Sequence, residues 1–87
     1  MENKQLLINK LENARKHLVG NKYRHFKGNI YEVKEIAVDS DTMGLAVVYQ
    51  NCEKPELIWT RTLEEFTSPI DKEKYPNIEQ TRRFERL

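Results

Sequence analysis

The sequence predicts a small α+β domain that is mainly β, with an N-terminal helix followed by a strongly bent antiparallel sheet or a partly open barrel. Residues 1–21 follow the period of a helix, and from residue 22 onward the apolar residues follow a period of two. Polar turn residues divide this second part into four or five short strands. We therefore expect one domain, with the helix over residues 1–21 and a small β-barrel with a charged C-terminal tail over residues 22–87.

An amphipathic helix explains the first segment. Asn3 can cap its start and Gly20 suits the left-handed position that follows a helix end. The apolar stripe has spacings of four, three and four residues, and consists of Leu7, Leu11, Ala14 and Leu18. This stripe can cover the core of the domain or pair with a second copy of the chain, so a homodimer through the helix is an open alternative.

Turns and a change of phase set the limits of the strands. Gly28 and Asn29 fall between two alternating segments and predict a tight turn. The alternation changes phase near Lys34, which predicts a β-bulge. A polar loop over residues 39–44 precedes the apolar run 45–50, which we expect to be the central strand, covered on both faces. A fourth strand is expected over residues 57–63, and a single helical turn over residues 63–66.

Composition excludes several classes of protein. The 87 residues include 15 Lys and Arg, 14 Asp and Glu, and one cysteine, and the net charge is +1. This charge is unlike that of a strongly basic nucleic-acid binder, and a single cysteine cannot form an internal disulfide framework. The chain has no apolar run long enough for a membrane span or a secretory signal. We expect a cytoplasmic protein that does not contact a membrane.

Aromatic and basic side chains on the strands are the best candidates for a binding surface. Large rigid rings beside a planar arginine donor suit ligand binding, but the same rings can also fill a small core. We expect Tyr31 and Trp59 to lie in the core, where Arg61 can stack on the tryptophan. For Tyr23 and Tyr49, the core and the binding surface stay open as alternatives. The candidate binding residues are Tyr23, His25, Lys27, Tyr49, Trp59 and Arg61.

A catalytic arrangement is the weaker alternative. His25 could act as a general base if Asp39 or Asp41 lay beside it, but no nucleophile or oxyanion-binding loop accompanies them in the sequence. Cys52 lies in a turn next to an acidic residue, and a neighbouring negative charge does not favour a reactive thiolate. The sequence contains no spacing of histidine and cysteine typical of a metal site, so we expect no metal and no cofactor.

The order of these motifs resembles a bacterial family of domains of unknown function, number 1653. The resemblance runs from Tyr23 to about Phe84 and implies a compact, SH3-like, β-rich domain, but it implies no reaction. Three positions differ from the family pattern: Asp41 stands in place of glutamate, Thr62 in place of proline and Glu65 in place of methionine. The matching residues are Tyr23, His25, Lys27, Gly28, Tyr31, Val33, Thr42, Tyr49, Trp59, Arg61, Phe66, Arg83 and Phe84.

We therefore expect a small cytoplasmic binding or adaptor module without catalytic activity, whose partner is a protein or peptide. Nucleic-acid binding is an alternative, since the basic excess lies at the two ends of the chain and related small barrels stack bases on strand aromatics. A small enzyme that uses His25 is the second alternative.

Overall fold

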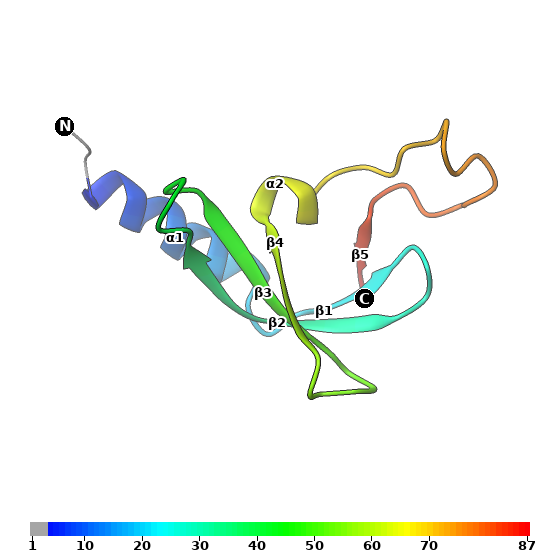
Figure 1. Ribbon diagram of the computed structural model, residues 1–87, viewed down its shortest axis with the longest axis horizontal. Helices are drawn as coiled ribbons and strands as arrows, with labels where there is room; N and C mark the ends of the chain where they lie inside the picture. The colour runs from blue at the N-terminus through cyan, green and yellow to red at the C-terminus, as the bar shows by residue number, and fades with distance from the viewer. Residues whose placement is uncertain (1–3) are drawn as a thin grey trace.

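Five antiparallel strands form one bent sheet, and two helices lie against it (Figure 1). The computed structural model describes residues 4–87, so the predicted cap at Asn3 lies outside the described residues. The predicted class, a helix followed by a mainly β domain, is confirmed. The elements are α1 (Lys4–Leu18), β1 (Lys22–His25), β2 (Ile30–Val38), β3 (Leu45–Asn51), β4 (Ile58–Thr62), α2 (Leu63–Phe66) and β5 (Phe84–Arg86).

The strands follow the order β4-β3-β2-β1-β5, which makes β4 and β5 the two edges of an open sheet. The central strand is therefore β2, and the prediction that residues 45–50 form it is wrong. The predicted turn is present between β1 and β2, where Gly28 has a φ of 111° that disfavours other residues. The predicted bulge is also present, as a shift of register between Val33 and Glu35. This bulge keeps Val33 and Ile36 on one face, and both are buried.

One face of the sheet, the inner face, carries most of the large side chains. Residues directly opposite each other on antiparallel strands share a face. The observed pairs on this face are Tyr23 with Tyr31, His25 with Phe84, Val33 with Tyr49, Ile36 with Val47, Val47 with Arg61, and Tyr49 with Trp59. Aromatic and apolar residues from all five strands therefore line a single concave surface.

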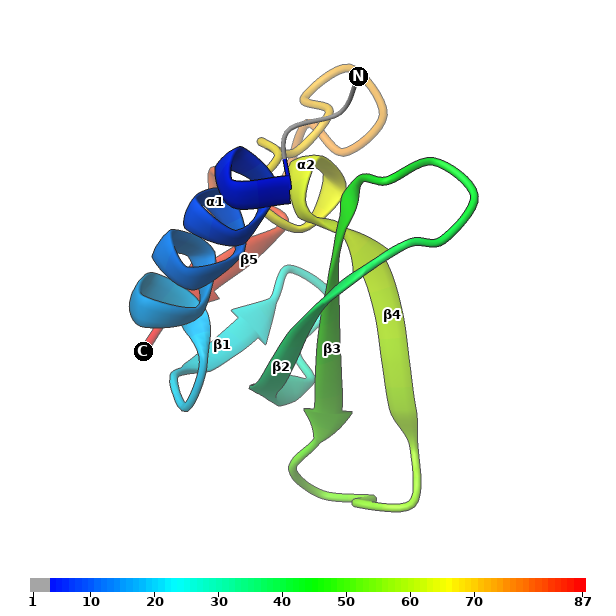
Figure 2. The same ribbon diagram turned by 90° about the vertical axis from the view of Figure 1, so that its left-hand side faces the viewer.

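The helices cover only one half of the inner face. Figure 2 shows α1 running alongside the sheet and next to α2. Ala14 is buried on the sheet, and Leu11 and Leu18 pack around the same core, so the predicted stripe covers the domain itself. Arg15 fixes the helix at the bulge, because its guanidinium donates to Glu35 Oε1 at 2.7 Å and to the Ile36 carbonyl at 3.1 Å.

The C-terminal segment returns to the sheet and completes the core. Residues 67–83 form a long loop, in which Ile70 is buried and the Gln80 amide donates to the Arg24 carbonyl at 2.9 Å. The chain then pairs with β1 as β5, a strand that the charged composition of this segment did not predict. Phe84 of β5 stacks on Phe66 of α2, with 4.1 Å between ring centroids. None of the described helices is long and apolar enough to cross a membrane.

Candidate functional site

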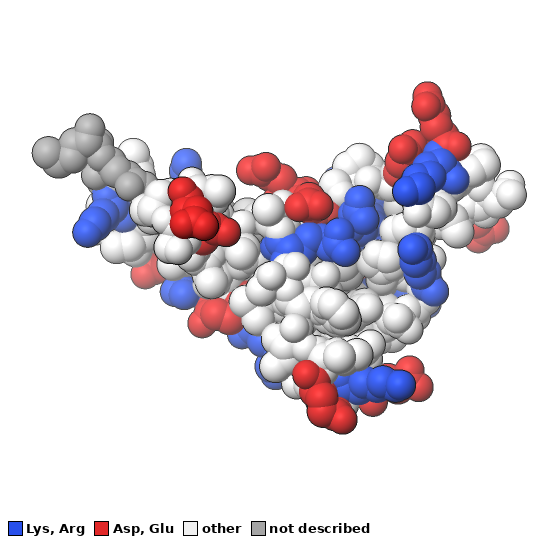
Figure 3. All heavy atoms as spheres, viewed as in Figure 1, with Lys and Arg blue, Asp and Glu red and all other residues white. Residues whose placement is uncertain are grey.

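The half of the inner face that the helices leave uncovered contains a pocket of about 220 Å³, between β1, β4 and β5. Its walls combine aromatic rings with basic side chains, and we call it the aromatic–cationic pocket. In Figure 3, lysine and arginine side chains gather near the centre of this face of the molecule. The lining residues are His25, Lys27, Asn29, Tyr31, Tyr49, Trp59, Arg61 and Phe84.

Five of the six candidate residues from the sequence line this pocket, and Tyr23 does not. Tyr23 is 6% exposed and packs edge-on against Phe66, so it belongs to the core. Tyr49 is 4% exposed and forms the floor of the pocket. The expectation that Trp59 lies in the core is wrong, because the residue is 47% exposed. The reason is its strand: β4 is an edge of the sheet, beyond the area that α1 and α2 cover.

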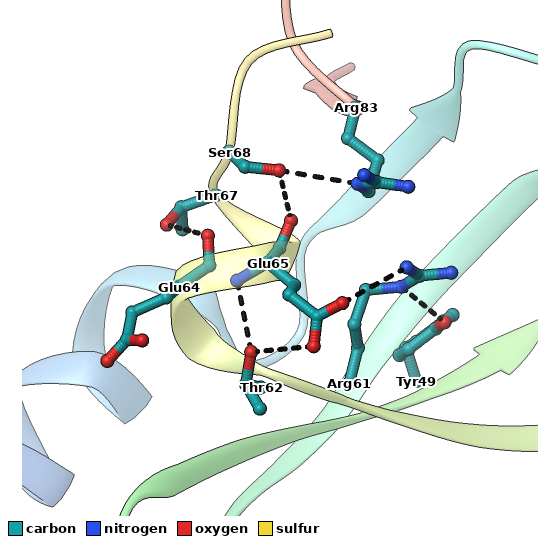
Figure 4. Close-up of polar contacts among 8 residues, drawn as sticks. All are labelled: Tyr49, Arg61, Thr62, Glu64, Glu65, Thr67, Ser68 and Arg83. Carbon is teal, nitrogen blue, oxygen red and sulfur yellow. Dashed lines mark hydrogen bonds and ion pairs between the residues drawn. The ribbon is translucent and has the colours of Figure 1, made fainter. Parts of the chain in front are cut away.

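Arg61 is held in place by three neighbours. Its Nε donates to the Tyr49 hydroxyl at 3.2 Å, and its Nη1 lies 4.0 Å from Glu65 Oε2 (Figure 4). The guanidinium lies over the ring of Phe84, 5.8 Å from its centroid, rather than over Trp59 as the sequence suggested. Among residues 4–87, no cation is stacked on the ring of Trp59, which is half-exposed.

Arg83 contributes a second guanidinium that the sequence analysis did not assign to the site. Its Nε donates to the Ser68 hydroxyl at 3.3 Å, and Figure 4 shows its guanidinium extending toward the same region as that of Arg61. The residue comes from the loop just before β5. The late Arg-Phe pair in the family pattern was the one signal in the sequence that could have identified it.

His25 is neutral at pH 7 in this environment. Burial, and after it the positive charges of Arg61, Arg83 and Lys27, together lower its pKa from 6.5 to about 4. The backbone N–H of Lys27 donates to His25 Nδ1 at 3.1 Å. The proton of the neutral ring is therefore assigned to Nε2, which makes that nitrogen a hydrogen-bond donor.

The structure does not bring His25 together with the two aspartates of the catalytic hypothesis. His25 packs against Tyr31 at the start of β2, whereas Asp39 follows the end of the same strand. The Asp39 carboxylate is instead occupied within its own loop, where it accepts from the backbone N–H groups of Asp41 and Thr42 at 2.8 and 3.1 Å. Cys52 is exposed in the turn after β3. Within residues 4–87, no three His, Cys, Asp or Glu side chains gather closely enough to hold a metal ion.

Two of the residues that differ from the family pattern act together beside the pocket. The Thr62 hydroxyl accepts from the backbone N–H of Glu65 and donates to its carboxylate, both at 3.1 Å (Figure 4). This reciprocal arrangement resembles a capping box and stabilises the start of α2. It also holds the Glu65 carboxylate next to Arg61. Thr62 and Glu65 together therefore set the charge at the rim of the pocket.

Comparison with known proteins identifies the family of the chain. The sequence model of a family described as a protein of unknown function, DUF1653, matches residues 21–86. The match covers most of the chain, from just after α1 through β5, and the chain therefore belongs to this family. No curated protein and no solved structure matches it.

Proposed function

We propose that this domain is a non-catalytic binding module that holds a peptide segment on the aromatic–cationic pocket. The observation that supports this most is the half-exposed Trp59 beside Arg61, over a pocket whose floor is the buried Tyr49. Removing an exposed tryptophan and its neighbouring rings from water favours association, and such residues dominate the energetics of many interfaces.

The position of β4 favours an extended peptide as the ligand. Because β4 is an edge of the sheet, its outer side has no strand to pair with among the described residues. An extended segment can add to such an edge through main-chain hydrogen bonds, while side-chain pockets select its sequence. The aromatic–cationic pocket is adjacent to this edge, since Trp59 and Arg61 belong to both.

The charges around the pocket favour a ligand with a local negative group. The positive charges of Lys27, Arg61 and Arg83 act on His25, whereas the only described carboxylate paired with any of them is that of Glu65. Carboxylates lie on both sides of this basic area in Figure 3, near α2 and at the loop that joins β3 and β4. A nucleic-acid strand would bring phosphates against these flanking carboxylates, which opposes the nucleic-acid alternative.

The proposal can be tested by titrating ¹⁵N-labelled protein with three pools: peptides with an anionic residue, neutral peptides, and short oligonucleotides. We expect the anionic peptides to shift the Trp59 indole signal and the amides of β4. Trp59→Ala should abolish these shifts. Ile58→Ala is the matched control, because Ile58 is 58% exposed and points to the opposite face of the same strand.

Two results would contradict the proposal. One is a set of shifts that leaves Trp59 and Arg61 unchanged with every peptide pool. The other is tighter binding of the oligonucleotides, with an affinity that falls steeply as salt rises, which would indicate phosphate-led contact with a nucleic acid.

A further inference from the structure

Two cations line the aromatic–cationic pocket, and a third, Arg83, lies beside it. Lys27 lies in the turn after β1, Arg61 on β4 and Arg83 just before β5, and all three act on His25. Lys27 and Arg83 have no carboxylate within 4.0 Å among residues 4–87, and Arg61 has Glu65 at that distance. With His25 neutral, the three positive charges that act on it and the one carboxylate paired with them give the surroundings of this ring a net charge of about +2.

The two arginines are positioned before any ligand arrives. Each guanidinium is held through its Nε. The Nε of Arg61 donates to the Tyr49 hydroxyl, and the Nε of Arg83 donates to the Ser68 hydroxyl. This leaves terminal Nη groups of both residues for other acceptors, and Figure 4 shows them on the same side. Holding side chains in place in this way reduces the entropy lost on binding, and arginine suits anions because its donors form a planar fork.

We propose that the aromatic–cationic pocket contains a subsite for a phosphate monoester, with Arg61, Arg83 and the Nε2–H of His25 as donors to its oxygens. This inference rests on the proposed function, since it specifies the anionic group of the bound peptide. A phosphate monoester carries about −1.5 to −2 charges at pH 7 and has three acceptor oxygens. It therefore balances the charge of the pocket, whereas a carboxylate supplies one charge and two oxygens.

The rings beside the cations indicate what carries the phosphate. Tyr31, Trp59 and Phe84 line the same pocket as Arg61 and His25, so a group that extends from the phosphate lies between aromatic surfaces. A flat aryl group gains most from such contacts, because rings pair edge-on or with an offset. The subsite accordingly fits an aryl phosphate, and within a peptide that chemistry is a phosphorylated tyrosine.

The test compares two small probes of similar shape, phenyl phosphate and benzoate, by the fluorescence of Trp59, which is the only tryptophan in the chain. Hydrogen bonds to charged groups contribute roughly 1.5–3 kcal/mol, so phenyl phosphate should bind at least about tenfold more tightly than benzoate. Arg83→Gln should weaken phenyl phosphate by a similar factor. Arg24→Gln is the control, because Arg24 pairs with Glu85 at 3.6 Å and, unlike Arg83, is not among the charged groups that act on His25.

His25 gives a second readout that a loss of folding would not mimic. A bound dianion offsets the positive charges that act on the ring. Phenyl phosphate should therefore raise the pKa of His25 above the value of about 4 that it has in the protein without ligand. The ¹³Cε1 shift of His25 measures this directly. The ring is in contact with Phe26, Tyr31 and Phe84, and the charged groups that act on it are Lys27, Arg61 and Arg83.

The outcomes separate this inference from the proposed function. Equal affinity for benzoate, or an unchanged affinity in folded Arg83→Gln, would overturn the phosphate subsite. If unphosphorylated peptides still shift Trp59 in that case, the proposed function stands. Tighter binding of adenosine monophosphate than of a phosphotyrosine peptide would overturn the peptide as the source of the phosphate.

Discussion

Replacing Phe66 by leucine should destabilise the fold far more than the same replacement of Trp59. Phe66 is 2% exposed and contacts three rings, with centroid distances of 4.1 Å to Phe84, 5.3 Å to Tyr23 and 5.5 Å to Tyr49. Aromatic pairs contribute roughly 0.5–1.5 kcal/mol each beyond burial, so losing three of them should cost about 2 kcal/mol or more. Trp59 has no ring contact among the described residues, and its replacement should cost less than about 1 kcal/mol.

Urea denaturation followed by circular dichroism measures both values. With about 1 kcal/mol per molar urea for a domain of this size, Phe66→Leu should lower the midpoint by roughly 2 M. In a thermal scan it should lower Tm by about 8–16 °C, whereas Trp59→Leu should lower it by a few degrees at most. Equal destabilisation by the two variants would refute the reasoning, because it would mean that Trp59 is part of the core.

Three further predictions concern local features of the fold. Thr62→Ala removes the cap of α2 and should cost about 1 kcal/mol in urea denaturation, whereas Thr60→Ala on the same strand should change stability by less than about 0.5 kcal/mol. Gly28→Ala places a side chain at a φ of 111° and should cost about 1–2 kcal/mol or more, which a midpoint within error of the wild type would contradict. Between pH 6.5 and 4, His25 takes up a proton in the unfolded chain but not in the folded one, because its folded pKa is about 4. Stability should therefore fall as pH decreases through this window, and the fall should be smaller in His25→Asn.

The sequence predicted those elements that depend on local patterns. The stripe on α1, the turn at Gly28 and the bulge before Glu35 follow from spacing and from the conformational freedom of glycine, and all three are present. The helical turn after β4 is present as well. Each of these features is determined by residues close together in the chain, so a single sequence carries the necessary information.

The features that the sequence did not predict depend on pairing between distant segments. The exposure of Trp59 follows from the place of β4 at an edge of the sheet, and no alternation of residues encodes that place. Similarly, β5 is three residues long and acquires its strand conformation by pairing with β1 more than 55 positions earlier. Arg83 lies beside the pocket only because of that pairing. A charged composition alone gave no reason to expect it.

The solvent exposure of Trp59 in the free protein tests the central claim most directly, because the pocket exists only if this face of the sheet is uncovered. A single tryptophan makes its fluorescence unambiguous. We predict a red-shifted emission and efficient quenching by acrylamide in the folded protein, with protection from the quencher when an anionic peptide is added. A blue-shifted emission that acrylamide barely quenches would contradict the account, because it would place Trp59 inside the core.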